Sequence, residues 1–299
     1  IFMGFVKTAR IRDKMHTLLL SAAFLLSFLT TGSSADEVSD KSQFSVFQPT
    51  PRHLMREMST DRPDKTESAY TVDAGHYQIE TSFLDYTYDH RNQDGTDTRA
   101  DNFSLFPTNF KIGLLNNADL QLVFDPNLIE RSEGEGEKEH KSGSGDLQTR
   151  LKVNLWGNDG GASALALMPF VKFPTNTNGL GNDEVEGGII IPLAVSLPGD
   201  WDMGLMTEFD FNRSAADDGY YTDFINSITF SHAIIGNLNG YIEFFSSFNN
   251  EPDLPWVGTL DGGLTYAVNE NVQFDAGVNI GLTRSAYDFN PFCGLSMRY

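Results

Sequence analysis

The chain has 299 residues, of which 40% are hydrophobic and 12% aromatic, and its formal net charge is −20. A nucleic-acid-binding protein needs a basic surface for the phosphate backbone, so this acidic balance argues against nucleic acid as a partner. Cys293 is the single cysteine, so an intramolecular disulfide is excluded. The apolar content suits either a buried core or a surface that faces lipid, and composition does not separate the two.

Residues 1–35 have the pattern of a secretory signal peptide. Basic residues occur from Lys7 to Lys14, an apolar stretch runs from Leu18 to Leu29, and small residues at 33–35 offer a cleavage site. A membrane-spanning helix needs about 20 apolar residues, more than this stretch contains. We therefore expect an exported protein whose signal is removed.

Residues 36–75 are polar and lack a sustained hydrophobic period. We expect a mobile extension over 36–58, followed by a charged segment that contains Pro63 and ends at Gly75.

The character of the sequence changes at residue 76, where blocks of alternating apolar and polar residues begin. In 146–156, Leu147, Leu151 and Leu155 share one parity, and Arg150 and Lys152 the other. Successive side chains of a strand point to opposite faces, whereas a helix would scatter these leucines around its circumference. The block therefore predicts a two-faced strand.

Comparable blocks predict twelve strands, with weaker alternation in 102–113 and a slip near Leu84. The expected strands are 76–89, 102–113, 119–125, 146–156, 163–173, 186–197, 201–212, 221–234, 238–249, 258–268, 272–280 and 289–299.

The connections between these strands alternate in length. Short connections (114–118, 157–161, 198–200, 235–237 and 269–271) alternate with longer ones (90–101, 126–144, 174–185, 213–220, 250–257 and 283–288). Outer-membrane barrels have short periplasmic turns and long extracellular loops, whereas a soluble sandwich has no reason to keep this order. We therefore predict an all-β fold over 76–299, a closed antiparallel up-and-down transmembrane β-barrel, with 36–75 as a periplasmic extension.

Membrane insertion also explains the apolar strand faces. In water they would form a patch larger than the few hundred Å² (on the order of 300–600) seen on monomers, whereas lipid solvates them. Alternating apolar residues that end at Tyr299 resemble the sorting signature of bacterial outer-membrane proteins. Aromatic residues near strand ends are expected in interfacial girdles: Trp156, Trp201, Tyr220, Tyr221, Trp256 and Tyr299.

The polar strand faces predict an acidic lumen. The candidate pore-lining residues are Glu80, Asp146, Arg150, Lys152, Asp202, Glu208, Asp210, Asp223, Glu243, Asp261, Asp275 and Arg298. Rings of carboxylates favour cations, so a weak cation preference is one interpretation. The other is that these groups pair, hydrate and fill a closed interior.

Residues 59–80 read STDRPDKTESAYTVDAGHYQIE. This stretch resembles the motif TDRPD-x-TES-x-Y-T-V-x-A-G-x-x-Q-x-E of outer-membrane transporters named after the MetA pathway of phenol degradation. The resemblance implies an outer-membrane barrel that passes small, aromatic molecules among others, without identifying a substrate. Two interpretations of its residues Asp61, Arg62, Pro63, Asp64 and Glu67 stay open. The motif folds into the periplasmic mouth, where Arg62 pairs lumenal carboxylates and restricts passage, or it caps the approach to the first strand.

An enzyme is not expected. Ser231 and His232 are adjacent and point to opposite faces of a strand, and no Gly-x-Ser-x-Gly elbow occurs among the strands. The acid-rich stretch 130–146 lacks the spacing of an EF-hand, so a flexible, soluble loop is preferred to a metal site. We expect neither a metal nor a cofactor.

The function expected from the sequence is a porin-like transporter in the bacterial outer membrane. Its partners would be outer-membrane lipid and small solutes, with small aromatic or hydrophobic compounds and cations as candidates. Two alternatives remain: an exported soluble β-sandwich that binds carbohydrate, and a structural outer-membrane barrel without transport.

Overall fold

The computed structural model describes residues 40–90, 98–134, 136–214, 219–251 and 255–299, so the expected signal peptide lies outside the described part. After a 3-10 turn, η1 (Arg52–Leu54), the strands are β1 (Tyr77–Asp89), β2 (Arg99–Leu105), β3 (Thr108–Leu115), β4 (Ala118–Phe124), β5 (Asn127–Gly134), β6 (Glu137–Gly143), β7 (Leu147–Trp156), β8 (Ser163–Phe173), β9 (Glu186–Leu197), β10 (Trp201–Arg213), β11 (Tyr220–Ile235), β12 (Leu238–Asn249), β13 (Val257–Asn269), β14 (Val272–Gly281) and β15 (Phe289–Arg298). Within these residues, no helix combines the length and the hydropathy that a membrane crossing requires.

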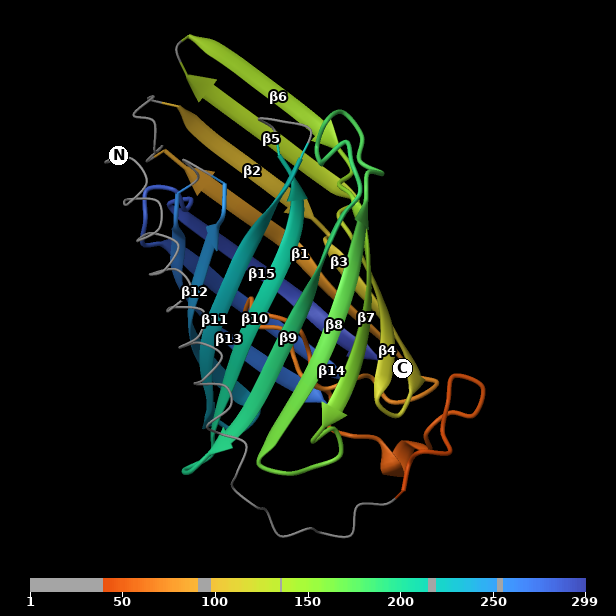
Figure 1. Ribbon diagram of the computed structural model, residues 1–299. Helices are drawn as coiled ribbons and strands as arrows, with labels where there is room; N and C mark the ends of the chain where they lie inside the picture. The colour runs from red at the N-terminus through yellow and green to blue at the C-terminus, as the bar shows by residue number, and fades with distance from the viewer. Residues whose placement is uncertain (1–39, 91–97, 135, 215–218, 252–254) are drawn as a thin grey trace, which may run out of the picture. The chain divides into compact units, whose positions relative to one another are not determined.

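The strands form one antiparallel sheet that closes on itself through pairing of β1 with β15 (Figure 1). The wall has twelve strand positions, because β2 and β3, β4 and β5, and β6 and β7 are the two parts of three interrupted strands. β1 shows this directly: Asp85–Asp89 pairs with β2, and Tyr77–Thr81 pairs with β3. The predicted twelve-stranded barrel is confirmed, and the two-sheet sandwich is not what the chain forms.

Two of the interruptions occur at proline. Pro107 separates β2 from β3, and Pro126 separates β4 from β5. Proline has no N–H for a ladder hydrogen bond, which favours a break at these two positions. Proline alone does not force one, because Pro169, Pro192 and Pro291 lie within the continuous strands β8, β9 and β15. The break also changes parity: Phe103 pairs with Tyr86 on the outward face and Phe110 with Ile79, also outward, although one position is odd and the other even. This change of parity explains the weak alternation of 102–113.

The two faces of the wall differ as a membrane barrel requires. On β7, Leu151 and Leu155 face outward and are 40% and 50% exposed, whereas Lys152 is fully buried. The largest buried side chains include Lys111, Lys152, Gln78 and Glu80. This arrangement is the reverse of a soluble protein, because hydrocarbon solvates the outer face and the polar groups lie inside.

The prediction of a flexible loop over 126–144 is wrong. Most of it forms the hairpin β5–β6, which continues the sheet beyond the barrel wall together with β2 (Figure 1). Cross-strand pairs of opposite charge hold it, for example Glu130 with Lys141 and Glu133 with Lys138. Opposite charges placed across a strand pair stabilise a sheet without apolar side chains. Its polarity therefore made an ordered hairpin look like a flexible loop.

The short connections lie at one end of the barrel, and residues 40–58 lie against them. Val46 N donates to Leu114 O at 2.8 Å, and Arg56 Nη2 donates to Asn116 O at 3.0 Å. The segment expected to be a mobile extension thus makes specific contacts with the short-turn rim in its described residues.

A lipid-facing charge should destabilise the wall. Leu151→Arg, near the middle of β7, is expected to lower the free energy of unfolding by roughly 2–4 kcal/mol, because an arginine would enter hydrocarbon. Urea unfolding of the protein folded in lipid vesicles measures this change. Ser132→Arg, on the hairpin beyond the wall, is the control and should change the unfolding midpoint little. Equal effects of both changes would contradict the assignment of the outer face.

Candidate functional site

Residues 59–75, here called the lumenal segment, lie inside the barrel. Side chains on the inward faces of β1, β3, β4, β7, β11, β12, β13 and β14 form hydrogen bonds or ion pairs with it. In Figure 1 this part of the chain is the orange coil seen between the strands of the wall. The interior of the barrel is therefore crossed by the chain's own N-terminal part.

Asp61 is the electrostatic centre of this segment. Its carboxylate lies between the ammonium groups of Lys111 on β3 and Lys152 on β7, with Lys152 Nζ at 2.6 Å. Lys111 also pairs with Glu80, whose carboxylate accepts the Asp61 backbone N–H at 3.0 Å. Both lysines are buried, and a buried charge is tolerated only when it is paired and hydrogen-bonded. Asp61 therefore supplies part of the countercharge that allows two lysines inside the wall.

Arg62 binds the opposite side of the lumen. Its guanidinium donates to both carboxylate oxygens of Asp275 on β14, at 2.6 and 3.2 Å, and to Ser82 Oγ on β1 at 2.6 Å. The guanidinium carbon also lies 5.7 Å from the ring centroid of Phe292. A bidentate arginine–carboxylate pair fixes orientation as well as position. Arg62 thus ties the segment to the strands that close the barrel.

The next residues contact β12 and β13. The backbone N–H groups of Lys65 and Thr66 donate to the two carboxylate oxygens of Glu243, at 2.9 and 2.8 Å. Lys65 Nζ lies 3.0 Å from Asp261 and 4.6 Å from the ring centroid of Phe245. Glu243 and Asp261 are cross-strand neighbours, so one pair of acids receives both backbone donors and the ammonium group.

The segment then returns toward β7 and β8. Glu67 forms an ion pair with Arg150, and Asn154 Nδ2 donates to Ala69 O at 2.8 Å. Ala69 packs against Ala164 and Ala166 of β8, and all three are almost fully buried. Small side chains on both partners allow the backbone to approach the wall closely. Asp64 lies near Glu243, a like charge.

The end of the segment is held at the short-turn rim. Asp73 lies 3.4 Å from Arg56 and 3.6 Å from Arg298, and Asp159, in the turn between β7 and β8, lies 2.7 Å from Lys41. Burial by itself would raise the pKa of Asp159, but hydrogen bonds from Lys41 and Asn116 and the charge of Arg56 lower it overall. These contacts connect residues 40–58, the segment and the rim.

The predicted pore-lining residues divide into three groups. The first contacts the lumenal segment: Glu80, Arg150, Lys152, Glu243, Asp261 and Asp275. The second lies at the short-turn rim, where Arg298 donates to Arg56 O at 2.8 Å and Asp202 is exposed.

The third group lies toward the long-loop end. Glu208 and Asp210 share the inward face of β10, and Asp210 is the cross-strand neighbour of Asp223 on β11. Asp146 instead accepts hydrogen bonds from Asn176 and from the Asn182 N–H of the loop 174–185. The prediction that Tyr221 belongs to the interfacial girdle is wrong. Tyr221 shares the inward parity of Asn212 and Asp223, whereas Tyr220 has the opposite parity.

Within the motif, Asp61, Arg62 and Glu67 each pair with inward-facing strand residues, as described above. The segment crosses the lumen, since it also reaches strands on the far side of the lumen from β1. Pro63 follows Arg62 through a cis peptide bond.

Two lumenal residues were not predicted from the sequence. Lys111 and Asp119 are fully buried lumenal groups, and Asp119 accepts the Val72 N–H at 3.0 Å. Lys111 lies just after the break at Pro107, where the change of parity hides which face a residue occupies. The alternation of Phe110 and Ile112 around Lys111 indicates its polar face once the strand is taken to begin after Pro107.

Loss of the central carboxylate should weaken the fold. Asp61→Asn would leave Lys111 and Lys152 with less countercharge, and breaking a buried ion pair costs about 3–5 kcal/mol. We expect a drop of that size in the free energy of unfolding, measured by urea titration in vesicles. Asp40→Asn, at an exposed carboxylate near the start of the described chain, is the matched control. An unchanged midpoint for Asp61→Asn would contradict the role given to this pair.

Comparison with known proteins agrees with the barrel architecture. A sequence model of the family described as "Putative MetA-pathway of phenol degradation" matches residues 60–299. No curated protein matches the chain.

Among solved structures, the COG4313 outer membrane channel from Pseudomonas putida F1 is similar with a TM-score of 0.53 and 12% identity, over 75% of this chain and 93% of that chain. The NanC porin aligns at a TM-score of 0.46 and 8% identity, over 74% of this chain and 98% of that chain. At 12% identity the likeness to the channel shows the fold, a barrel of the kind found in the bacterial outer membrane. With its motif, its closed wall and a match over residues 60–299, the chain belongs to the family described as "Putative MetA-pathway of phenol degradation".

Proposed function

We propose that this porin-like outer-membrane barrel passes small solutes through its lumen, and that the lumenal segment controls their passage. The observation that carries the proposal is the chemistry of the contacts between segment and wall. They are mainly ion pairs and hydrogen bonds, such as Asp61 with Lys152, Arg62 with Asp275 and Lys65 with Asp261. Water can replace such polar contacts when the segment leaves, although each hydrogen bond to a charged group contributes about 1.5–3 kcal/mol net. Displacement of the segment would therefore expose little apolar surface.

Two features support candidate solutes. Aromatic rings line the lumen beside the segment, where Phe245 and Tyr287 face the Lys65 ammonium and Phe292 faces Arg62. After displacement, these ring faces would be available for stacking with a small aromatic compound. Phenol degradation in the family's description favours the same class of solute.

The acids at the long-loop end support a cation preference. Glu208, Asp210 and Asp223 lie on inward faces there, and carboxylate-lined constrictions select cations. The structural barrel without transport stays the second candidate, because the lumenal segment also stabilises the wall.

We do not assign a catalytic role to this protein. Ser231 pairs in register with Asp202 on the inward parity, whereas His232 lies outward with its ring centroid 4.7 Å from that of Trp201. A nucleophile and its base must be within hydrogen-bond reach of one another, and these two point apart.

A reversible crosslink tests control by the segment. Thr66 Oγ1 lies 2.6 Å from Ser227 Oγ on β11, so Thr66→Cys with Ser227→Cys places two thiols in bonding range. Both changes are made in a Cys293→Ser background, since Cys293 is exposed. We expect single-channel recordings in planar bilayers to show no conductance steps under oxidising conditions and steps after a reductant is added.

Thr66→Cys alone, in the same background, is the control and should not respond to reductant. Steps of equal size and frequency before and after reduction would show that the route does not depend on the segment. No steps in any form of the protein would favour the structural barrel.

Selectivity tests the acidic end of the lumen. Asp210→Asn with Asp223→Asn removes two negative charges from facing positions on β10 and β11. We expect the permeability ratio of potassium to chloride to fall, as reversal potentials in a salt gradient would measure. Glu137→Gln, on the exposed hairpin, is the control. A ratio that does not change would oppose a solute route along these carboxylates.

A further inference from the structure

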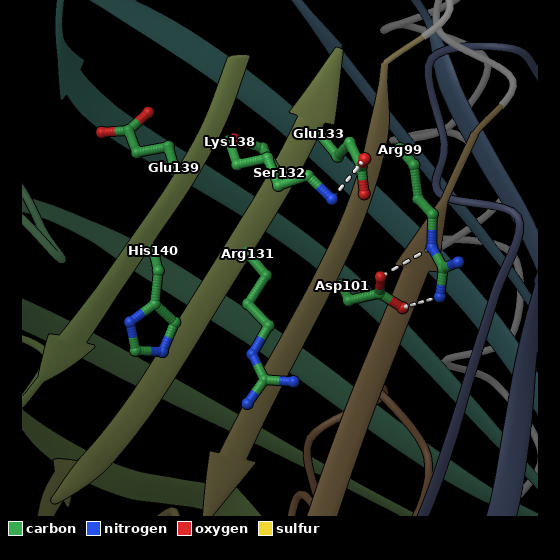
Figure 2. A pocket seen from close by; sticks show the side chains of 8 residues that line it. All are labelled: Arg99, Asp101, Arg131, Ser132, Glu133, Lys138, Glu139 and His140. Atoms are coloured by element: carbon green, nitrogen blue, oxygen red, sulfur yellow. Dashed lines mark hydrogen bonds and ion pairs between the residues drawn. The ribbon is translucent and has the colours of Figure 1, made fainter. Parts of the chain in front are cut away.

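The part of the sheet beyond the barrel wall carries a pocket that the transport proposal does not use. Strands β2, β5 and β6, here called the sheet extension, form it at the long-loop end (Figure 2). Its volume is 440 Å³, and its lining includes Arg99, Arg131, Lys138 and His140. Asp101, Glu133 and Glu139 also line the pocket, so it brings four basic and three acidic side chains together in a chain whose net charge is −20.

The strand register shows which side of the sheet carries the pocket. Asp101 pairs with Tyr88 on β1 and with Arg131 on β5, and Arg131 pairs with His140 on β6. These side chains therefore share one face with Tyr88, which lies against Phe289 at a centroid distance of 5.3 Å. Phe289 is on the lipid-facing parity of β15, the opposite of Asn290, which is buried inside. The pocket consequently opens on the outer, membrane side of the sheet.

The level of the pocket follows from the aromatic residues below it. The ring centroids of Tyr86 and Phe103 lie 4.8 Å apart. Tyr88 and Phe289 continue this aromatic cluster at the end of the wall. Aromatic belts mark the boundary between hydrocarbon and headgroups. Arg131 and His140 come next along the sheet, beyond the belt, at the level of the headgroups of the outer leaflet.

Some of the basic side chains in the pocket form ion pairs and others do not. Arg99 pairs with Asp101 at 2.7 Å and Lys138 pairs with Glu133 at 2.6 Å, so each acid on this face has its own partner. Arg131 lies over the Phe103 ring at 5.5 Å, but neither Arg131 nor His140 forms a hydrogen bond or ion pair with another described residue. Figure 2 shows these two side chains projecting in the same direction from neighbouring strands. Two basic donors are thus left for a ligand.

We propose that this pocket binds a phosphate group in the headgroup of an outer-leaflet glycolipid, through Arg131 and His140. The Arg131 guanidinium matches two phosphate oxygens with parallel N–H donors, and its face already rests on an aromatic ring. The His140 imidazole donates from the neighbouring strand. A lipid headgroup fits better than free phosphate, because the site faces the membrane and the aromatic belt below it can pack against the lipid's sugars and chains.

Native mass spectrometry of the full folded barrel in detergent tests this proposal, with diphosphorylated lipid A as the probe. We expect one lipid A to bind, and Arg131→Gln with His140→Gln to weaken binding about tenfold, which corresponds to about 1.4 kcal/mol, because glutamine keeps a neutral donor but loses the charge-assisted hydrogen bonds. Arg284→Gln is the matched control. Arg284 is also exposed, lies in the loop after β14 at the same end, and has no ion pair with a described residue.

Two further arms distinguish the source of the phosphate. Lipid A from which both phosphates have been removed should bind about tenfold more weakly to the parent protein and equally to parent and double variant. Inorganic phosphate at millimolar concentration should not displace the lipid. Displacement by inorganic phosphate, or equal binding of diphosphorylated lipid A by parent, double variant and control, would overturn the proposal.

Folding of the variants is checked by the change of gel mobility on boiling, which folded membrane barrels show. The single variant His140→Gln, at an exposed position, gives a second reading if the double variant does not fold. It should weaken binding by a smaller factor, and unchanged binding in His140→Gln would count against the histidine's part in the site. Arg131→Lys, which keeps the charge and loses the two parallel donors, should bind between the parent and Arg131→Gln.

Discussion

The constraint on which this structure depends is that every backbone polar group inside a membrane must be paired within the protein. Hydrocarbon offers no hydrogen bonds, so an open sheet edge cannot be left there. Pairing of β1 with β15 meets this requirement by closing the sheet. Closure then has a consequence for the side chains: each strand of alternating residues must place its polar half in the interior. The acidic and basic groups of the lumen follow from the same rule that makes the outer wall apolar.

The polar interior creates a second requirement, which the lumenal segment meets. Lys111 and Lys152 lie on neighbouring parts of the wall and are both buried, so each needs a countercharge. Asp61 provides it from a part of the chain that is not a strand, while Arg62 and Lys65 pair with Asp275 and Asp261 on the other side. In the proposed function, stability and solute passage are therefore coupled. The contacts that hold the lumenal segment against the wall would have to break before a solute passes.

Beyond the barrel wall, the sheet is no longer apolar on its outer face. The aromatic belt places the sheet extension beyond the hydrocarbon, so its strands can carry charges on both faces, and among the described residues β6 is the last strand of the sheet order. Ion pairs within and between its strands stabilise it, such as Arg99 with Asp101 on β2 and Lys138 of β6 with Glu133 of β5, whereas Arg131 and His140 form no ion pair with another described residue. The hairpin β5–β6 of this extension was expected to be a flexible acidic loop, because polarity usually indicates a loop. Pairing between opposite charges is a property of two strands together, and it is visible only when their register is known.

The sequence by itself determined the class of this protein. Two-faced strands, alternating short and long connections and an apolar face on every strand leave a membrane barrel as the consistent solution, because each of these signals is local and is repeated along the chain. Only the tertiary structure decided which groups meet inside. Arg62 and Asp275 are 213 residues apart, and Lys65 and Asp261 meet across a comparable separation. Such pairs depend on the stagger of the closed sheet, just as the inward position of Lys111 depends on the change of parity at Pro107. A single shift of one residue moves a side chain from the lumen to the lipid, and no local pattern records how those shifts add up around the wall.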